Sequence, residues 1–87
     1  MLTDNLVLEE LPESERDRRI AADPRATCVP RTYLVRRRGR IVGRLYYNAV
    51  GVLYATKLAV GVTWREESVE TALAWIAAEP IQLWRAA

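Results

Sequence analysis

The residues best suited to chemistry in this 87-residue chain are arginines, and they gather in one segment. The stretch Arg31–Asn48, RTYLVRRRGRIVGRLYYN, holds six arginines among its eighteen residues and no aspartate or glutamate. A guanidinium stays charged at any physiological pH, and its planar fork fits a phosphate or a carboxylate. Because the arginines are interleaved with Val, Leu, Ile and Tyr, the segment predicts a β-structure with an anion-binding surface.

Groups that commonly carry catalysis are scarce. The chain has no histidine and one cysteine, Cys28, which alone can build neither a disulfide nor a zinc site. Ser14 and Ser68 lie in acidic, helix-like surroundings without a base to activate them. Glu66 and Glu70 would share a helix face, but such a pair is typical of a solvated helix surface. We therefore expect a binding protein and not an enzyme, with no catalytic residue, no metal and no cofactor.

Composition predicts one folded domain spanning residues 1–87. Apolar residues make up 51% of the chain and charged residues 28%, which is ordinary globular composition. The longest uncharged stretch, Leu45–Thr56, is 12 residues long, whereas a membrane span needs about 20. The start of the chain does not resemble a secretion signal, and a lone cysteine fits a reducing compartment. We expect a cytoplasmic protein that does not enter a membrane.

Charge is strongly segregated along the chain although the net charge is only +2. Residues 1–23 hold seven acids and three arginines, and residues 66–87 hold four acids and one arginine. Between them, residues 24–65 hold eight arginines, one lysine and no acid at all. The middle of the chain is therefore predicted to form a basic surface, of the kind that attracts a phosphate backbone.

The first third of the chain predicts a short charged helix. Pro12 suits the start of a helix, and Asp23-Pro24 suits its end. The segment before it remains open between a short strand over Leu6–Leu8 and a helical turn capped by Asp4.

The clearest β signal is a hairpin. Arg31–Arg38 and Ile41–Asn48 are rich in β-branched and aromatic residues and flank Gly39, which suits a tight turn. A third strand is predicted over Val52–Val62, with a bend near its end at Gly61. A helix across Ala49–Val60 is the rival interpretation of that third segment.

The last third predicts the longest helix. Thr63 followed by Glu66 matches a capping box, and Pro80 would end the helix. IQLWR, residues 81–85, is then a further short strand or a tail. The predicted fold is therefore a small α+β domain, with a three-stranded antiparallel sheet packed on a C-terminal helix, a short charged N-terminal helix, and room for an extra short strand at either terminus.

Alternation along the strands predicts which side chains share a face. If Tyr33, Val35, Ile41, Leu45 and Tyr47 meet the C-terminal helix, together with the even-numbered residues of the third strand, most cations collect on the opposite face. Arg37 and Arg40 would then lie near the tip of the hairpin. The full predicted binding set is Arg36, Arg37, Arg38, Arg40, Arg44, Tyr46 and Lys57. This prediction requires Arg36, Arg44 and Lys57 to point the same way; the alternative is a solvated face neutralised by acids from elsewhere in the chain.

Over Arg31–Ala78, a three-stranded sheet followed by a helix, with arginines on the outer face, is similar in outline to plant AP2-type domains and to the arm-binding domains of phage integrases. The resemblance rests on the order of elements and on charge, since YLVRRRGRIVGRLYY lacks the tryptophan and glycine framing of those families. It implies a DNA-binding sheet. We accordingly expect the basic face to bind an anionic macromolecule, with DNA or RNA as the first choice.

A second class of function is a small inhibitor or adaptor that docks on a protein or nucleoprotein complex and blocks it. Short chains poor in histidine resemble phage or plasmid accessory proteins, including inhibitors of the anti-CRISPR type. Trp75 and Trp84 would then offer a second contact surface, because tryptophan is enriched in binding hot spots. Packing in the core is the alternative role for both. Homodimerisation, through an uncovered sheet edge or through the Ala74/Ala78 side of the last helix, is a further expectation.

Overall fold

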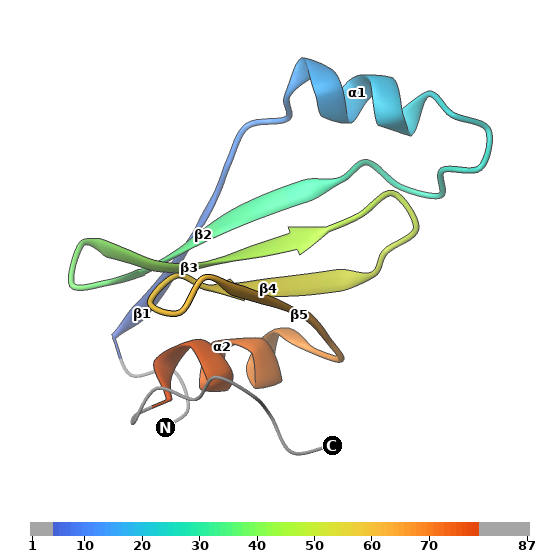
Figure 1. Cartoon of the computed structure of the whole chain (residues 1–87). Helices are drawn as coiled ribbons and strands as arrows, with labels where there is room; N and C mark the ends of the chain where they lie inside the picture. The colour runs from blue at the N-terminus through green and yellow to red at the C-terminus, as the bar shows by residue number, and fades with distance from the viewer. Residues whose placement is uncertain (1–4, 79–87) are drawn as a thin grey trace.

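The computed structural model describes residues 5–78, which form one antiparallel sheet and two helices (Figure 1). The α+β class is as predicted, but the sheet has five strands where the sequence predicted three and an optional extra one. In chain order the elements are β1 (Leu6–Glu10), α1 (Glu15–Ala21), β2 (Arg31–Arg37), β3 (Arg40–Tyr47), β4 (Leu53–Lys57), β5 (Val62–Glu66) and α2 (Val69–Ala77).

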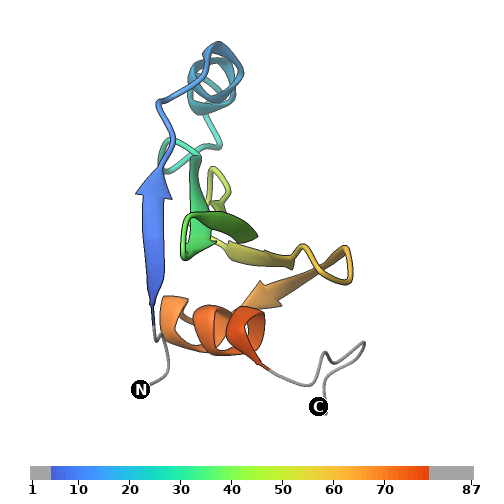
Figure 2. The same ribbon diagram turned by 90° about the vertical axis from the view of Figure 1, so that its left-hand side faces the viewer.

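The sheet is a meander in which each strand pairs antiparallel with the next, in the order β1-β2-β3-β4-β5. α2 packs against one side of the sheet, which we call the inner face, and α1 lies on the other side, the outer face (Figures 1 and 2). Figure 2 also shows the strong twist that turns β1 away from the direction of β5. None of the helices within residues 5–78 has both the length and the apolarity to cross a membrane.

The predicted hairpin is β2 and β3, and its turn is formed by Arg38 and Gly39. Both residues have positive φ, 52° and 81° respectively. Two successive positive φ values are typical of the tight turn whose twist matches that of the flanking strands. Glycine adopts this conformation freely, whereas arginine is strained in it.

The third predicted strand is in fact two strands. β4 ends at Lys57, and residues 58–61 turn the chain back into β5, with the Gly61 N–H donating to the Lys57 carbonyl at 2.9 Å. Gly61 has a φ of 66°, so the bend predicted there is a complete reversal. Lys57 pairs directly with Val62, so the residues that face inward are odd-numbered in β4 and even-numbered in β5.

The predicted start of the last helix is also wrong. Thr63 lies in β5, and the N-cap of α2 is Ser68, whose hydroxyl accepts the Thr71 N–H at 3.2 Å. The short N-terminal helix is present, and Ser14 caps it by accepting the N–H of Asp17 at 3.0 Å. The open segment before it is the strand β1. The predicted C-terminal strand at residues 81–85 lies outside the described residues.

The hydrophobic core lies between the inner face and α2. It is formed by Val35, Leu45, Leu53, Ala55, Ala72, Leu73, Trp75 and Ile76. The helix approaches β3 closely at Gly43: a Cβ placed on this residue would lie 2.7 Å from Ile76 Cδ1 and 2.9 Å from the Thr56 carbonyl oxygen. Because α2 packs on the inner face of β3 and β4, the outer face of these strands is not covered by this helix.

Candidate functional site

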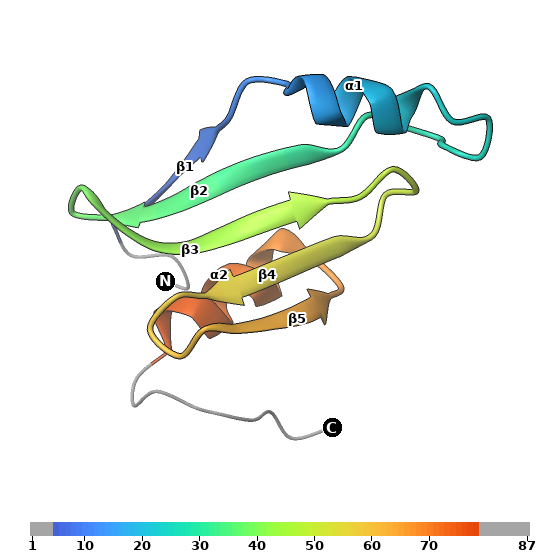
Figure 3. The ribbon, with the colours of Figure 1, turned by 45° about the horizontal axis from the view of Figure 1, so that its top comes forward.

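Figure 3 shows the outer face of the sheet obliquely, with α2 behind it. This face carries two rows of side chains across four strands, all of them polar or aromatic except one leucine. Directly opposed residues of antiparallel strands share a face. The strand register therefore places Thr32, Tyr46, Tyr54 and Arg65 in one row, and Leu34, Arg44, Thr56 and Thr63 in the next.

Two tyrosines form the aromatic part of this face. Tyr46 of β3 and Tyr54 of β4 are directly opposed, so their side chains project from adjacent central strands in the same direction. Both are half-buried. Tyr46 was predicted here, whereas Tyr54 was predicted on the inner face because the third strand was taken to continue to Val62 without a reversal.

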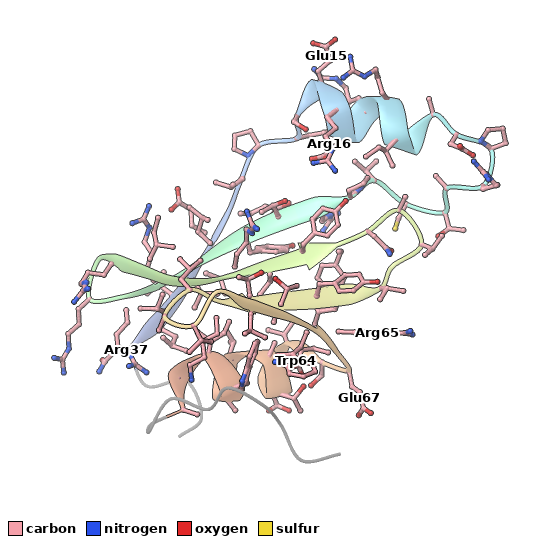
Figure 4. The ribbon with its side chains drawn as sticks, in the orientation of Figure 1. Glu15, Arg16, Arg37, Trp64, Arg65 and Glu67 are labelled. Carbon is pink, nitrogen blue, oxygen red and sulfur yellow. The ribbon has the colours of Figure 1, made fainter. Side chains whose placement is uncertain are left out.

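Arg44 and Arg65 flank the two tyrosines. Both are exposed, and neither makes an ion pair within residues 5–78. Figure 4 shows Arg65 extending from β5 into solvent. Arg44 is a predicted site residue found on the predicted face, whereas Arg65 was missed because its segment was assigned to a helix.

Arg36 also lies on the outer face, as predicted, but its charge is partly neutralised. Its Nε donates to Glu9 Oε1 at 2.9 Å, and its Nη1 donates to the Gly39 carbonyl at 3.1 Å. Among the described residues, the alternative of a face neutralised by N-terminal acids therefore holds for Arg36 and not for Arg44.

Lys57 is on the wrong face for the predicted site. It is 2% exposed, and its Nζ donates to the carbonyls of Trp75 and Ala78, each at 2.9 Å. An ammonium group at this place stabilises the C-terminal end of α2, where the helix dipole favours positive charge. The requirement that Arg36, Arg44 and Lys57 share one face is therefore not met.

The remaining predicted arginines lie around the hairpin. Arg37 belongs to the inner side, where its Nη2 donates to the Ala77 carbonyl of α2 at 3.4 Å (Figure 4). Arg38 lies in the turn itself and not on the outer face, and Arg40 is the first residue of β3, opposite Arg37. The pairing of β2 with β3 shifts in register between Val35 and Arg36. Beyond this shift, Ile41, which was predicted in the core, is 42% exposed.

The tryptophans do not form the second contact surface in the described part of the chain. Trp75 is 4% exposed and meets Trp64 edge-to-face, with ring centroids 6.3 Å apart. Trp84 lies outside the described residues. The core role weighed for Trp75 is therefore the one that the structure shows.

Beside α1 the outer face is hollowed into a groove of about 400 Å³. Its floor is formed by Arg44, Tyr46, Tyr54 and the three threonines 32, 56 and 63. Its wall includes Arg16 of α1, and Figure 4 shows that Arg16 is directed toward the sheet whereas Glu15 is directed away from it. Arg16 makes no ion pair with any other described residue. The sequence did not predict Arg16 as a site residue, because the sequence of a seven-residue charged helix does not show which side of the helix faces the sheet.

The groove contains more positive than negative charge. Its one acid among the described residues is Asp17, which is buried and closes the capping box of α1 by accepting the Ser14 N–H at 3.5 Å. Two guanidiniums, Arg16 and Arg44, therefore face one carboxylate that already serves the helix cap. In the floor, the hydroxyl oxygens of Thr56 and Thr63 are 2.8 Å apart, so one of their two hydrogens remains free to donate.

Other arginines near α1 are neutralised. Arg18 lies 3.8 Å from Glu13, Arg19 lies 3.2 Å from Glu15, and Arg25 lies 2.9 Å from Asp23. Side-chain hydrogen bonding to Arg25 lowers the pKa of Asp23 below its ordinary value, and a hydrogen bond to the Arg25 backbone acts in the same direction. Free positive charge on the helix side of the groove is therefore concentrated at Arg16.

Within residues 5–78 no cluster of three His, Cys, Asp or Glu side chains could hold a metal ion. Comparison of the chain with models of protein families, with curated proteins and with solved structures gives no match.

Proposed function

We propose that this protein is a non-enzymatic nucleic-acid-binding protein and that the outer face of its sheet is the binding surface. The observation that carries the proposal is the opposed pair Tyr46 and Tyr54 flanked by Arg44 and Arg65, two exposed arginines without ion pairs in the described chain. Aromatic rings that stack on bases and guanidiniums that contact phosphates are the two components of such surfaces.

The proposal is favoured over a merely solvated face by the way in which charge is distributed. On this face the charge of Arg36 is partly offset within the chain by its ion pair with Glu9. Arg44 and Arg65 lack such partners among the described residues and lie next to aromatic side chains. Guanidiniums left unpaired beside rings retain their full capacity to bind phosphate.

Binding should depend on salt in proportion to the number of phosphates contacted. With Lys57 buried and Arg36 engaged by Glu9, three arginines near the face make no ion pair with any residue in the range 5–78: Arg16, Arg44 and Arg65. Three contacts predict a log–log slope of affinity against salt of about −2 on a single strand and about −3 on a duplex.

The experiment is a fluorescence-anisotropy titration of labelled DNA and RNA at low and at moderate salt. The double variant Arg44→Gln and Arg65→Gln should bind at least about tenfold more weakly, since each removes a charge-assisted hydrogen bond, and its salt slope should be shallower. The matched control, Arg18→Gln and Arg19→Gln, removes the same charge from ion-paired positions on α1. Equal losses in the two double variants would show that net charge matters and the outer face does not.

A second candidate function, docking on a protein or nucleoprotein complex as an inhibitor or adaptor, is favoured by the free edge of β1. This strand pairs only with β2 in the described structure, and its Val7 and Leu8 are 60% and 40% exposed. Unpaired strand edges with apolar side chains readily accept a strand of a partner or of a second copy. Sedimentation of the protein alone tests the second copy: a dimer that Val7→Lys converts to a monomer would assign the edge to self-association.

A further inference from the structure

The groove beside α1 differs from the rest of the outer face because it has a wall. α1 stands over the sheet at the side of β2, and the segment that leads into it contributes Leu11 and Pro12 to the lining (Figures 1 and 3). Arg16 reaches toward the sheet from this wall, and Arg44 rises from the floor. Two guanidiniums that have no ion pair within the described part of the chain therefore approach one cavity from two different elements.

The size and lining of the groove suit a small planar group together with an anion. A volume of about 400 Å³ lies toward the lower end of the range for small-molecule sites. The floor offers the rings of Tyr46 and Tyr54, and beside them the hydroxyls of Thr56 and Thr63, one of which has a hydrogen to donate. Rings that stack and hydroxyls that bond to polar edges are the groups that recognise a nucleobase once it has left its stack.

We infer that the groove holds one unpaired nucleotide, with its base against Tyr46 and Tyr54 and its phosphate between Arg16 and Arg44, so that the ligand of this protein is single-stranded nucleic acid. The inference rests on the proposed function and specifies its substrate class. Single-stranded DNA and single-stranded RNA share the chemistry that the groove recognises.

A duplex does not fit the same arrangement. Its bases are stacked on one another and paired, so their faces are not available to a tyrosine unless a nucleotide is extruded at a cost. The tyrosines are half-buried in the floor of the sheet, and α1 stands beside them as an obstacle to a rigid double helix. A flexible single strand can pass below Arg16 and place one base at a time on the floor.

The test compares a labelled single strand of about 12 nucleotides, as DNA and as RNA, with the duplex of the same sequence at low salt. We expect the single strand to bind about tenfold more tightly than the duplex. Arg16→Gln should weaken single-strand binding several-fold, and the control Arg18→Gln, on the same helix but ion-paired with Glu13 and outside the groove, should not.

Replacement of a groove tyrosine separates stacking from charge. Tyr54→Leu should weaken single-strand binding about tenfold, which is the scale of a lost base stack, and should weaken duplex binding much less, because paired and stacked bases do not reach the ring. Tyr54→Phe keeps the ring and should retain single-strand binding, so it shows whether a loss in the leucine variant reflects stacking or a disturbed fold, which circular dichroism also checks.

The outcomes distinguish this inference from the proposed function. Duplex binding as tight as single-strand binding, or equal effects of Arg16→Gln and Arg18→Gln, would overturn the inference and leave a nucleic-acid-binding face in place. No binding of any of the oligonucleotides at low salt would overturn both. Tighter binding of a single strand than of the duplex supports the inference whichever of DNA and RNA is preferred, and a preference between them identifies the ligand further.

Discussion

Arg38 is the residue whose backbone and side chain are in clearest conflict. It has a φ of 52° in the turn between β2 and β3, a conformation that costs an ordinary L-residue about 1 kcal/mol relative to asparagine or glycine. Asn-Gly is the preferred pair for this kind of turn. The backbone strain is confined to Arg38, because the second positive φ of the turn belongs to Gly39, which adopts it without strain.

We therefore predict that Arg38→Asn raises the free energy of unfolding by about 0.5–1 kcal/mol. Urea denaturation followed by circular dichroism measures this change. Arg40→Asn removes the same charge two residues further along, at a position without positive φ. This control variant should not raise the free energy of unfolding. A gain of equal size in both variants would attribute the effect to charge repulsion among the hairpin arginines and not to the turn.

At the residue scale, the sequence predicted side chains correctly where a strand was regular and failed where it was not. Arg44 and Tyr46 lie in an uninterrupted part of β3, so alternation placed them on the outer face as expected. Lys57 was predicted on the wrong face because the alternation of side chains was continued across the turn at residues 58–61, where the chain reverses. Periodicity fixes relative direction within one strand, and it carries no information across a reversal whose length is unknown.

At the scale of elements, the closest contact is between α2 and β3 at Gly43. We predict that Gly43→Ala lowers the free energy of unfolding by about 1–3 kcal/mol. An added Cβ would meet Ile76 Cδ1 at 2.7 Å and the Thr56 carbonyl oxygen at 2.9 Å. The side chain of Ile76 could yield, but the backbone of β4 could not do so without disturbing its pairing with β3.

A double-mutant comparison checks this cause. Ile76→Val removes Cδ1, so Gly43→Ala should cost less in that background than in the wild type, as urea denaturation midpoints would show. An unchanged cost would place the conflict at the Thr56 carbonyl and at Ile76 Cγ2, which lies 2.9 Å from the added Cβ and is kept in the valine variant. No loss of stability in Gly43→Ala itself would mean that α2 does not approach β3 as closely as described.

The elements themselves were only partly predictable. The β2–β3 hairpin and the short helix α1 were foreseen from Gly39 and from the charged segment after Pro12. The start of α2 was misplaced because Thr63 and Glu66 have capping-box spacing, while the same residues also fit a strand in which Val62 and Trp64 face inward. Local capping signals were outweighed here by the pairing of β5 with β4.

At the scale of the whole molecule, the core lies on the inner face of the sheet and the proposed binding surface on the outer face. Lys57→Met should lower the free energy of unfolding by about 2 kcal/mol, because two carbonyls at the end of α2 lose a charged donor. Oligonucleotide binding measured well below the denaturation midpoint should stay as in the wild type, since Lys57 is buried on the inner face.

Arg44→Met provides the matched comparison, because it removes one charge from the outer face and should weaken binding while hardly changing stability. A large loss of binding in Lys57→Met, in a protein shown to be folded, would contradict the separation of the two faces.

The order of the strands also has a consequence for how the chain acquires its structure. β2, β3, β4 and β5 follow one another through short connections, whereas β1 reaches β2 only after the excursion that contains α1. Closing a longer loop costs more chain entropy and delays the contact that it brings. The four hairpin-linked strands are thus expected to assemble first and β1 to join last, so the cavity beneath α1 would come into existence only at the final step of folding.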